Sequence, residues 1–189
     1  MLEMENTLYD PMEGFTPISP GLYEAHLVGF DDREFDSGSK VFNFTFQLAD
    51  EVGKMDVPVL KSDGNGEYVP DGKKMTKATH LVGRKFKSVG IWLTPNPGEG
   101  EGWKNKNYLK FCENLGIIFD KVETKTKLAE IEEMDVLGLP AIARIGVETY
   151  EDKETQEMKK TMKVFEVLPW GAGVKMDKAE IEAEDDLPF

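Results

Sequence analysis

A chain of 189 residues, with 40% hydrophobic and 31% charged residues and a net charge of −13, is long enough for one domain with a sizeable core. No stretch approaches the ~18 apolar residues of a membrane span, and the acidic start lacks the basic and apolar regions of a signal peptide. Because Cys112 is the only cysteine and the two histidines are well separated, an internal disulfide is excluded and a zinc site is disfavoured. We therefore expect an intracellular protein without a membrane segment, a metal ion or another cofactor.

The first part of the chain predicts an irregular arm and then two strands. Residues 1–19 show no clear period, and residues 22–30 are expected to form the first strand. Residues 31–38 are rich in Asp, Ser and Gly, which predicts a turn. Residues 40–48 give the clearest strand signal, because apolar and polar residues alternate. One face of this strand, expected to fill the interior of a barrel, carries Phe42, Phe44, Phe46 and Leu48.

Residues 50–82 read as a long insertion. A short strand is expected near residues 55–60, with turns at 62–66 and 70–72. A long loop inside a compact domain is usually functional or mobile. Residues 83–93 predict the next strand, which the Pro- and Gly-rich run 95–102 interrupts.

The second half of the chain predicts a helix and two more strands. Asn105 can cap a helix that has an apolar stripe and ends near Gly116. A shorter helix is expected over residues 127–134, and strands over 139–150 and 158–168. Residues 170–189 contain no further core-forming pattern and predict a flexible tail.

The order of these elements is three strands, a helix and two strands. A five-stranded barrel with a helix between its third and fourth strands is the oligonucleotide-binding (OB) fold. The expected structure is therefore mainly β with one or two helices, and its barrel contains a long insertion. We assign residues 1–19 to an N-terminal arm, 20–169 to the OB-fold domain and 170–189 to a disordered acidic tail. The architecture alone names no function.

Positive charge is concentrated in one segment of this acidic chain. Residues 73–110 contain nine basic and two acidic residues, a net charge of +7. Such a stripe can bind phosphate, although a solvated charged loop would look the same. Binding of single strands also needs aromatic faces that stack on bases. The candidate DNA-binding residues are Lys73, Lys77, Arg84, Lys85, Phe86, Lys87, Trp92, Trp103, Lys104 and Lys106. Trp103 is the best candidate for stacking on a base. Phe86 and Trp92 are equally compatible with a place in the core.

Signals for catalysis are weak. The residues around Gly72 and Lys73 fail the phosphate-binding loop pattern at its first and last positions. Glu157 and Lys159 could belong to a nuclease site, but the nearest Pro-Asp pair is distant in sequence. We assign no catalytic residue and expect a protein that is not an enzyme.

The end of the chain carries the most specific motif. An acidic run ends in a phenylalanine that bears the terminal carboxylate, and such termini are captured by pockets that read the carboxylate and the neighbouring side chain. The five residues expected to bind a partner are Asp185, Asp186, Leu187, Pro188 and Phe189. They resemble the acidic tip of bacterial and bacteriophage single-stranded DNA-binding proteins.

This resemblance implies a bacteriophage protein in the cytoplasm of a bacterial host. It would coat single-stranded DNA during replication, recombination and repair, and its tip would recruit replication and recombination proteins. The arm and the insertion depart from the compact bacterial proteins, so we expect a monomer or a dimer. Two alternatives remain open: an adaptor that docks through its tail without binding DNA, and a nuclease.

Overall fold

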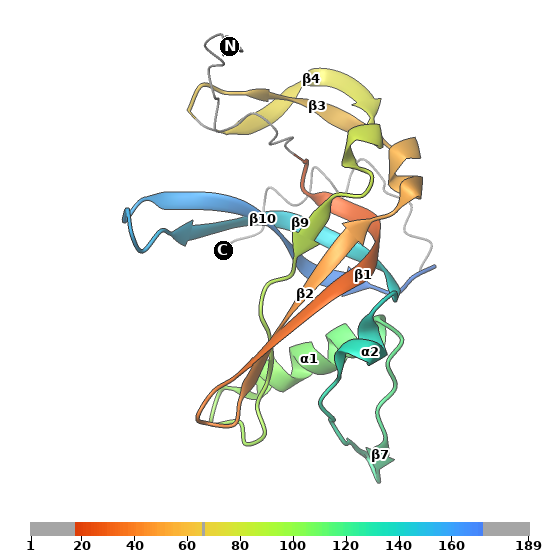
Figure 1. Cartoon of the computed structure of the whole chain (residues 1–189), viewed down its shortest axis with the longest axis vertical. Helices are drawn as coiled ribbons and strands as arrows, with labels where there is room; N and C mark the ends of the chain where they lie inside the picture. Colours follow the sequence, from red (N-terminus) through yellow and green to blue (C-terminus); the bar gives the residue numbers. More distant parts are fainter. Residues whose placement is uncertain (1–17, 66, 172–189) are drawn as a thin grey trace, which may run out of the picture.

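The computed structural model describes residues 18–65 and 67–171, and these residues form a mainly β, OB-fold-like barrel (Figure 1). All neighbouring strands of the main sheet are antiparallel. The sheet order is β10 (Met158–Leu168), β9 (Pro140–Glu151), β1 (Gly21–Glu34), β2 (Lys40–Leu48) and β5 (Lys85–Lys87), and β6 (Ile91–Leu93) also pairs with β2. The predicted fold class is confirmed.

The barrel is nearly closed where the chain between β5 and β6 meets β10. Ser88 forms a parallel bridge with Val164, and the Val89 N–H donates to the Val164 carbonyl at 2.9 Å. On its other side Ser88 binds β2, because its hydroxyl oxygen accepts the Phe44 N–H at 2.9 Å. Ser88 thus joins the third strand of the barrel to its second and fifth.

The core lies inside the barrel and under one helix. Phe42, Phe44 and Phe46 are fully buried, as the alternation in β2 predicted. Helix α1 (Gly102–Asn114) packs against β6 and β10, and its Phe111 ring stacks on Phe44 at a centroid distance of 4.6 Å. Gly116 follows the helix with φ +84°, a conformation that favours glycine at a helix end, as predicted.

Several local predictions were wrong. The turns expected at 31–38 and 70–72 fall partly or wholly within β1 and β4 (Tyr68–Lys77). The strand expected over 83–93 is two short strands, because residues 88–90 turn toward β10. Helix α1 begins at Gly102, before Asn105, whose side chain instead bonds the backbone N–H and carbonyl of Thr94 at 2.8 Å each. Residues 127–132 have no regular secondary structure, and only residues 133–134 of the expected helix are helical. The small hairpin β7 (Lys121–Val122) and β8 (Lys125–Thr126) precedes this stretch, and the one-turn helix α2 (Glu133–Val136) ends it.

The insertion is a β-hairpin that lies beyond one end of the barrel (Figure 1). Strand β3 (Asp56–Ser62) confirms the predicted short strand, and β4 (Tyr68–Lys77) pairs with it. The 3-10 turns η1 (Asp50–Lys54) and η2 (Ala78–Leu81) connect the hairpin to the barrel through buried Val52, Ala78 and Leu81. No helix among the described residues is long and apolar enough to cross a membrane.

Replacing Ser88 with alanine is expected to lower the free energy of unfolding by about 1–3 kcal/mol, because the buried Phe44 N–H loses its acceptor. Urea unfolding measures this change. Ser37→Ala is the matched control, since Ser37 is exposed and its hydroxyl accepts only a long 3.4 Å bond from Ser39. Equal unfolding midpoints for the two variants would contradict a role for Ser88 in holding the barrel.

Candidate nucleic-acid interface

One outer face of the barrel is formed by β1, β2 and the β5–β6 segment, and we call it the β2 face. Because Phe42, Phe44 and Phe46 point inward, the alternate residues of β2 point outward. Cross-strand pairing places Gln47 between His26 and Lys85, Thr45 between Gly29 and Lys87, and Val41 between Arg33 and Trp92. Residues from three separate segments therefore share this face.

One end of the β2 face carries stacked aromatic rings and cations. The Trp92 ring stacks on Phe35 at a centroid distance of 5.2 Å and an interplanar angle of 27°. The Arg33 guanidinium carbon lies 4.9 Å from the Phe35 centroid, and the Lys104 ammonium lies 5.3 Å from the Trp92 centroid. We call Arg33, Phe35, Trp92 and Lys104 the aromatic–cation cluster. Such a set offers both π-faces and positive charge to a ligand.

The other end of the β2 face carries Lys85 and Lys87, both exposed. Lys87 faces Asp31 at 3.8 Å, and their side chains are 62% and 70% exposed. An ion pair this exposed contributes little free energy, so the ammonium can exchange the carboxylate for a phosphate. Beside Lys87 the strands leave little room for a side chain at position 29, since a Cβ on Gly29 would be 3.0 Å from the Cβ of Thr45.

A similar exchange is available to Lys104. Its ammonium binds the Glu101 carboxylate at 2.7 Å. That bond, together with the hydrogen bond from the Gly98 N–H, lowers the pKa of Glu101. Glu101 is therefore ionised at neutral pH and holds Lys104 beside Trp92 until a stronger anion replaces it.

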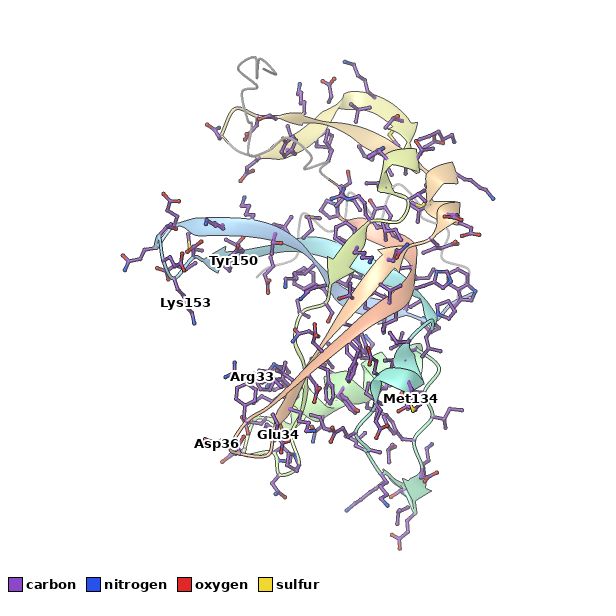
Figure 2. The ribbon with its side chains drawn as sticks, viewed as in Figure 1. Arg33, Glu34, Asp36, Met134, Tyr150 and Lys153 are labelled. Atoms are coloured by element: carbon purple, nitrogen blue, oxygen red, sulfur yellow. The ribbon has the colours of Figure 1, made fainter. Side chains whose placement is uncertain are left out.

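Two hairpin tips border the β2 face. Figure 2 shows Arg33 and Asp36 near the β1–β2 tip and Tyr150 and Lys153 near the β9–β10 tip, and both hairpins project to the left of the view. In OB folds, oligonucleotides bind on the face of the second and third strands, between these same two loops. The aromatic–cation cluster lies near the tip of the β1–β2 hairpin.

The structure brings together four of the residues predicted from sequence. Lys85, Lys87 and Trp92 belong to the β2 face, and Lys104 of α1 lies over Trp92 at its edge. Phe86 points the other way into the core, and the Arg84 guanidinium carbon lies 5.1 Å from its ring centroid. Burial lowers the pKa of Arg84 from its ordinary value, while the nearby Tyr23 acts in the opposite sense.

The remaining predicted residues lie elsewhere. Lys73 and Lys77 are on β4 of the insertion, where Lys77 pairs with Asp56 at 2.9 Å. Trp103 and Lys106 are both on α1, Trp103 because the helix begins earlier than expected. Residues 185–189, the predicted partner-binding tip, lie outside the described residues.

Two residues of the aromatic–cation cluster were missed from sequence. Arg33 and Phe35 fall in a stretch interpreted only as a turn, although an arginine two residues before a phenylalanine at a hairpin is a usable signal. Their partner Trp92 is distant in sequence, and the register of β2 with both neighbours brings them together.

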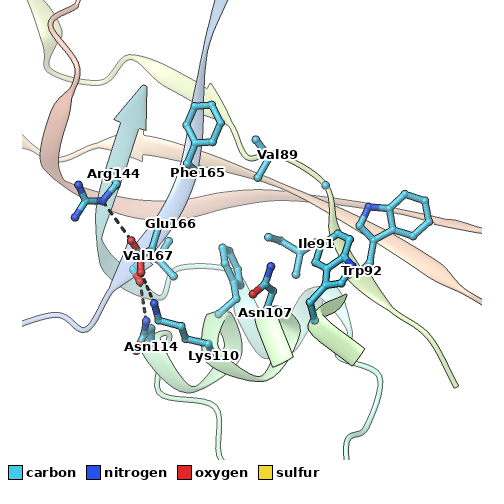
Figure 3. Close-up of a pocket in the computed structure, with 13 residues that line it drawn as sticks. Val89, Ile91, Trp92, Asn107, Lys110, Asn114, Arg144, Phe165, Glu166 and Val167 are labelled. Carbon is cyan, nitrogen blue, oxygen red and sulfur yellow. Dashed lines mark hydrogen bonds and ion pairs between the residues drawn. The ribbon is translucent and has the colours of Figure 1, made fainter. Parts of the chain in front are cut away.

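A groove lies beside the cluster, between α1, the β6 segment and β10 (Figure 3). Its volume is about 370 Å³. Trp92 lines one end, and the other polar or aromatic lining residues are Trp103, Asn107, Lys110, Phe111, Asn114, Arg144, Phe165 and Glu166.

A scan of protein-family models and a search of curated proteins each gave no match for this chain. Within residues 18–65 and 67–171, no three His, Cys, Asp or Glu side chains lie close enough together to hold a metal ion.

Proposed function

We propose that this chain binds single-stranded DNA without strong sequence preference and protects it during phage DNA replication, recombination and repair. Its acidic C-terminal tip recruits partner proteins. The observation that carries the proposal is the aromatic–cation cluster beside Lys85 and Lys87 on the outer face of an OB-fold-like barrel. The acidic tip, which resembles that of known single-stranded DNA-binding proteins, supports it independently.

Binding on this face follows from simple chemistry. A base stacks on Trp92 or Phe35 by displacing the Lys104 or Arg33 side chain that lies over each ring. Every base has a π-face, so the contact tolerates any sequence. The ammonium groups of Lys87 and Lys104 leave Asp31 and Glu101 for phosphates, and counterions are released from the strand. Affinity should therefore fall steeply as salt rises.

The rival from another class is an adaptor that docks on replication proteins through its tail without binding DNA. The C-terminal motif favours both functions equally. Titration of labelled oligo-dT at two salt concentrations separates them, because an adaptor gives no salt-dependent shift. Adding Mg²⁺ to the same mixtures tests a nuclease, which would shorten the oligonucleotide.

Replacing both Lys85 and Lys87 with alanine is expected to weaken binding of all oligonucleotides alike and to flatten the salt dependence. Each lost phosphate contact lowers the slope of log affinity against log salt by about 0.7 for single strands, so the pair should lower it by about 1.4. Fluorescence anisotropy at several salt concentrations measures the slope.

The matched control removes the same charge from another hairpin. Lys121 and Lys125 are exposed on β7 and β8, away from the β2 face. Replacing both with alanine should leave the slope unchanged. If the two double variants behave alike, general charge explains the effect and the β2 face is not the site.

A further inference from the structure

We infer that the bound strand continues past Trp92 into the groove between α1 and β10, where a base contacts Trp103 and a phosphate binds at Lys110 and Arg144. This inference rests on the proposed function and extends it to a second part of the surface. Trp92 connects the two parts, because it belongs to the aromatic–cation cluster and also lines the groove.

The groove presents apolar rings to solvent. The side chains of Trp103 and Phe165 are 53% and 41% exposed. Phe165 lies at a bulge in β10, and a Cβ on Gly146 would be 3.1 Å from its ring, so the glycine leaves room for this position. Exposed rings in a concave site indicate a ligand with a flat apolar surface.

The charges of the groove indicate that this ligand is an anion. Glu166 lies between two cations, 2.6 Å from the Lys110 ammonium and 3.2 Å from Nε of Arg144 (Figure 3). Of the charged residues that line the groove, two are cations and one is a carboxylate. A phosphate can therefore join or replace the carboxylate, as proposed for Asp31 and Glu101 on the β2 face.

The size of the groove agrees with this occupant. About 370 Å³ lies near the lower end of the ~300–1,000 Å³ range of small-ligand sites. The groove suits a ligand with a flat ring and a phosphate, and it continues from a surface suited to a single strand. We therefore infer that its occupant is the next part of that strand.

The first test varies oligonucleotide length. The ligands are oligo-dT from about 4 to about 16 nucleotides, which spans the site sizes of OB folds. Trp103→Ala should weaken binding of the longest oligonucleotide by at least about fivefold, the lower limit for one stacked base, and leave the shortest unchanged. Trp103→Phe should restore most of the loss. Ile118→Ala, which removes another highly exposed apolar side chain, is the control.

The second test changes the charge of the groove. Glu166→Gln should tighten binding of the longest oligonucleotide and raise its salt slope by about 0.7, because one more cation becomes available to a phosphate. Glu148→Gln is the matched control, since Glu148 pairs with Lys163 at 4.0 Å and does not line the groove.

The outcomes separate the two ideas. If wild type binds no oligonucleotide, the proposed function fails and the inference fails with it. If wild type binds and depends on Lys85 and Lys87, but Trp103→Ala is normal at every length, the inference alone is overturned. Binding of dTMP that depends on Trp103, without any effect of length, would show a free-nucleotide site and would also overturn it.

Discussion

Replacing Trp92 with alanine is expected to weaken oligo-dT binding by about fivefold to 150-fold, because one stacked base contributes ~1–3 kcal/mol. Trp92 should have a larger effect than any single lysine, since it holds both neighbours in place. Its ring stacks on Phe35 and lies under the Lys104 ammonium. Fluorescence anisotropy with labelled oligo-dT at low and moderate salt measures the loss.

Two further substitutions separate stacking from folding. Trp92 is half-buried and pairs with Val41, so the alanine variant must first be shown to unfold at a similar urea concentration. Trp92→Phe keeps a π-face and should retain most of the affinity, while Trp92→Leu keeps apolar volume without a π-face and should lose it. A leucine variant that binds like wild type would exclude stacking at this position.

The order of strands could be predicted from sequence wherever one face of a strand is buried and the other is not. Residues 40–48 were assigned with the bounds of β2, because alternation along the strand reports the two faces of the sheet directly. The last strand was also placed correctly over 158–168. The OB fold is recognised from the order of strands and helices along the chain. These strands and the one long helix were therefore enough to predict the barrel.

The errors arose where distant residues decide the local structure. Residues 127–134 contain helix formers, yet the Tyr108 hydroxyl donates to the Ala129 carbonyl and accepts the Ile131 N–H. These bonds hold that stretch in a non-helical conformation. Strand β4 was missed because Pro70 and Gly72, usually turn residues, lie inside it. Pro70 still pairs with Leu60 of β3, while Gly72, with φ +62°, lies where the register between the two strands shifts.

The candidate site was predictable in its charge but not in its shape. Local composition identified Lys85, Lys87 and Lys104. It could not show that Arg84 lies over a core ring on the other side of β5. Nor could it bring Phe35 to Trp92, because that contact depends on the register of β2 with two neighbours.

The tail motif predicts a separable function. The acidic run of residues 182–186 imitates a short polyanion, so it can compete with DNA for the protein's own cations. The last described residues bring the start of the tail close to the β2 face, because the Trp170 ring lies 5.9 Å from His26, which pairs with Gln47. Deleting residues 182–189 should therefore keep or modestly raise DNA affinity, most visibly at low salt where screening is weak.

Phe189→Ala is expected to abolish partner recruitment and to leave DNA affinity almost unchanged. In the proposed function the ring fills a pocket on the partner. Removing it changes no charge, so the expected competition between tail and DNA stays as it was. Pull-downs from infected-cell extract with wild type and Phe189→Ala measure recruitment, and oligo-dT titrations of the same samples measure DNA binding. Identical sets of bound replication proteins would show that the terminal ring is not the anchor. A parallel loss of DNA affinity would mean that the two functions share a surface.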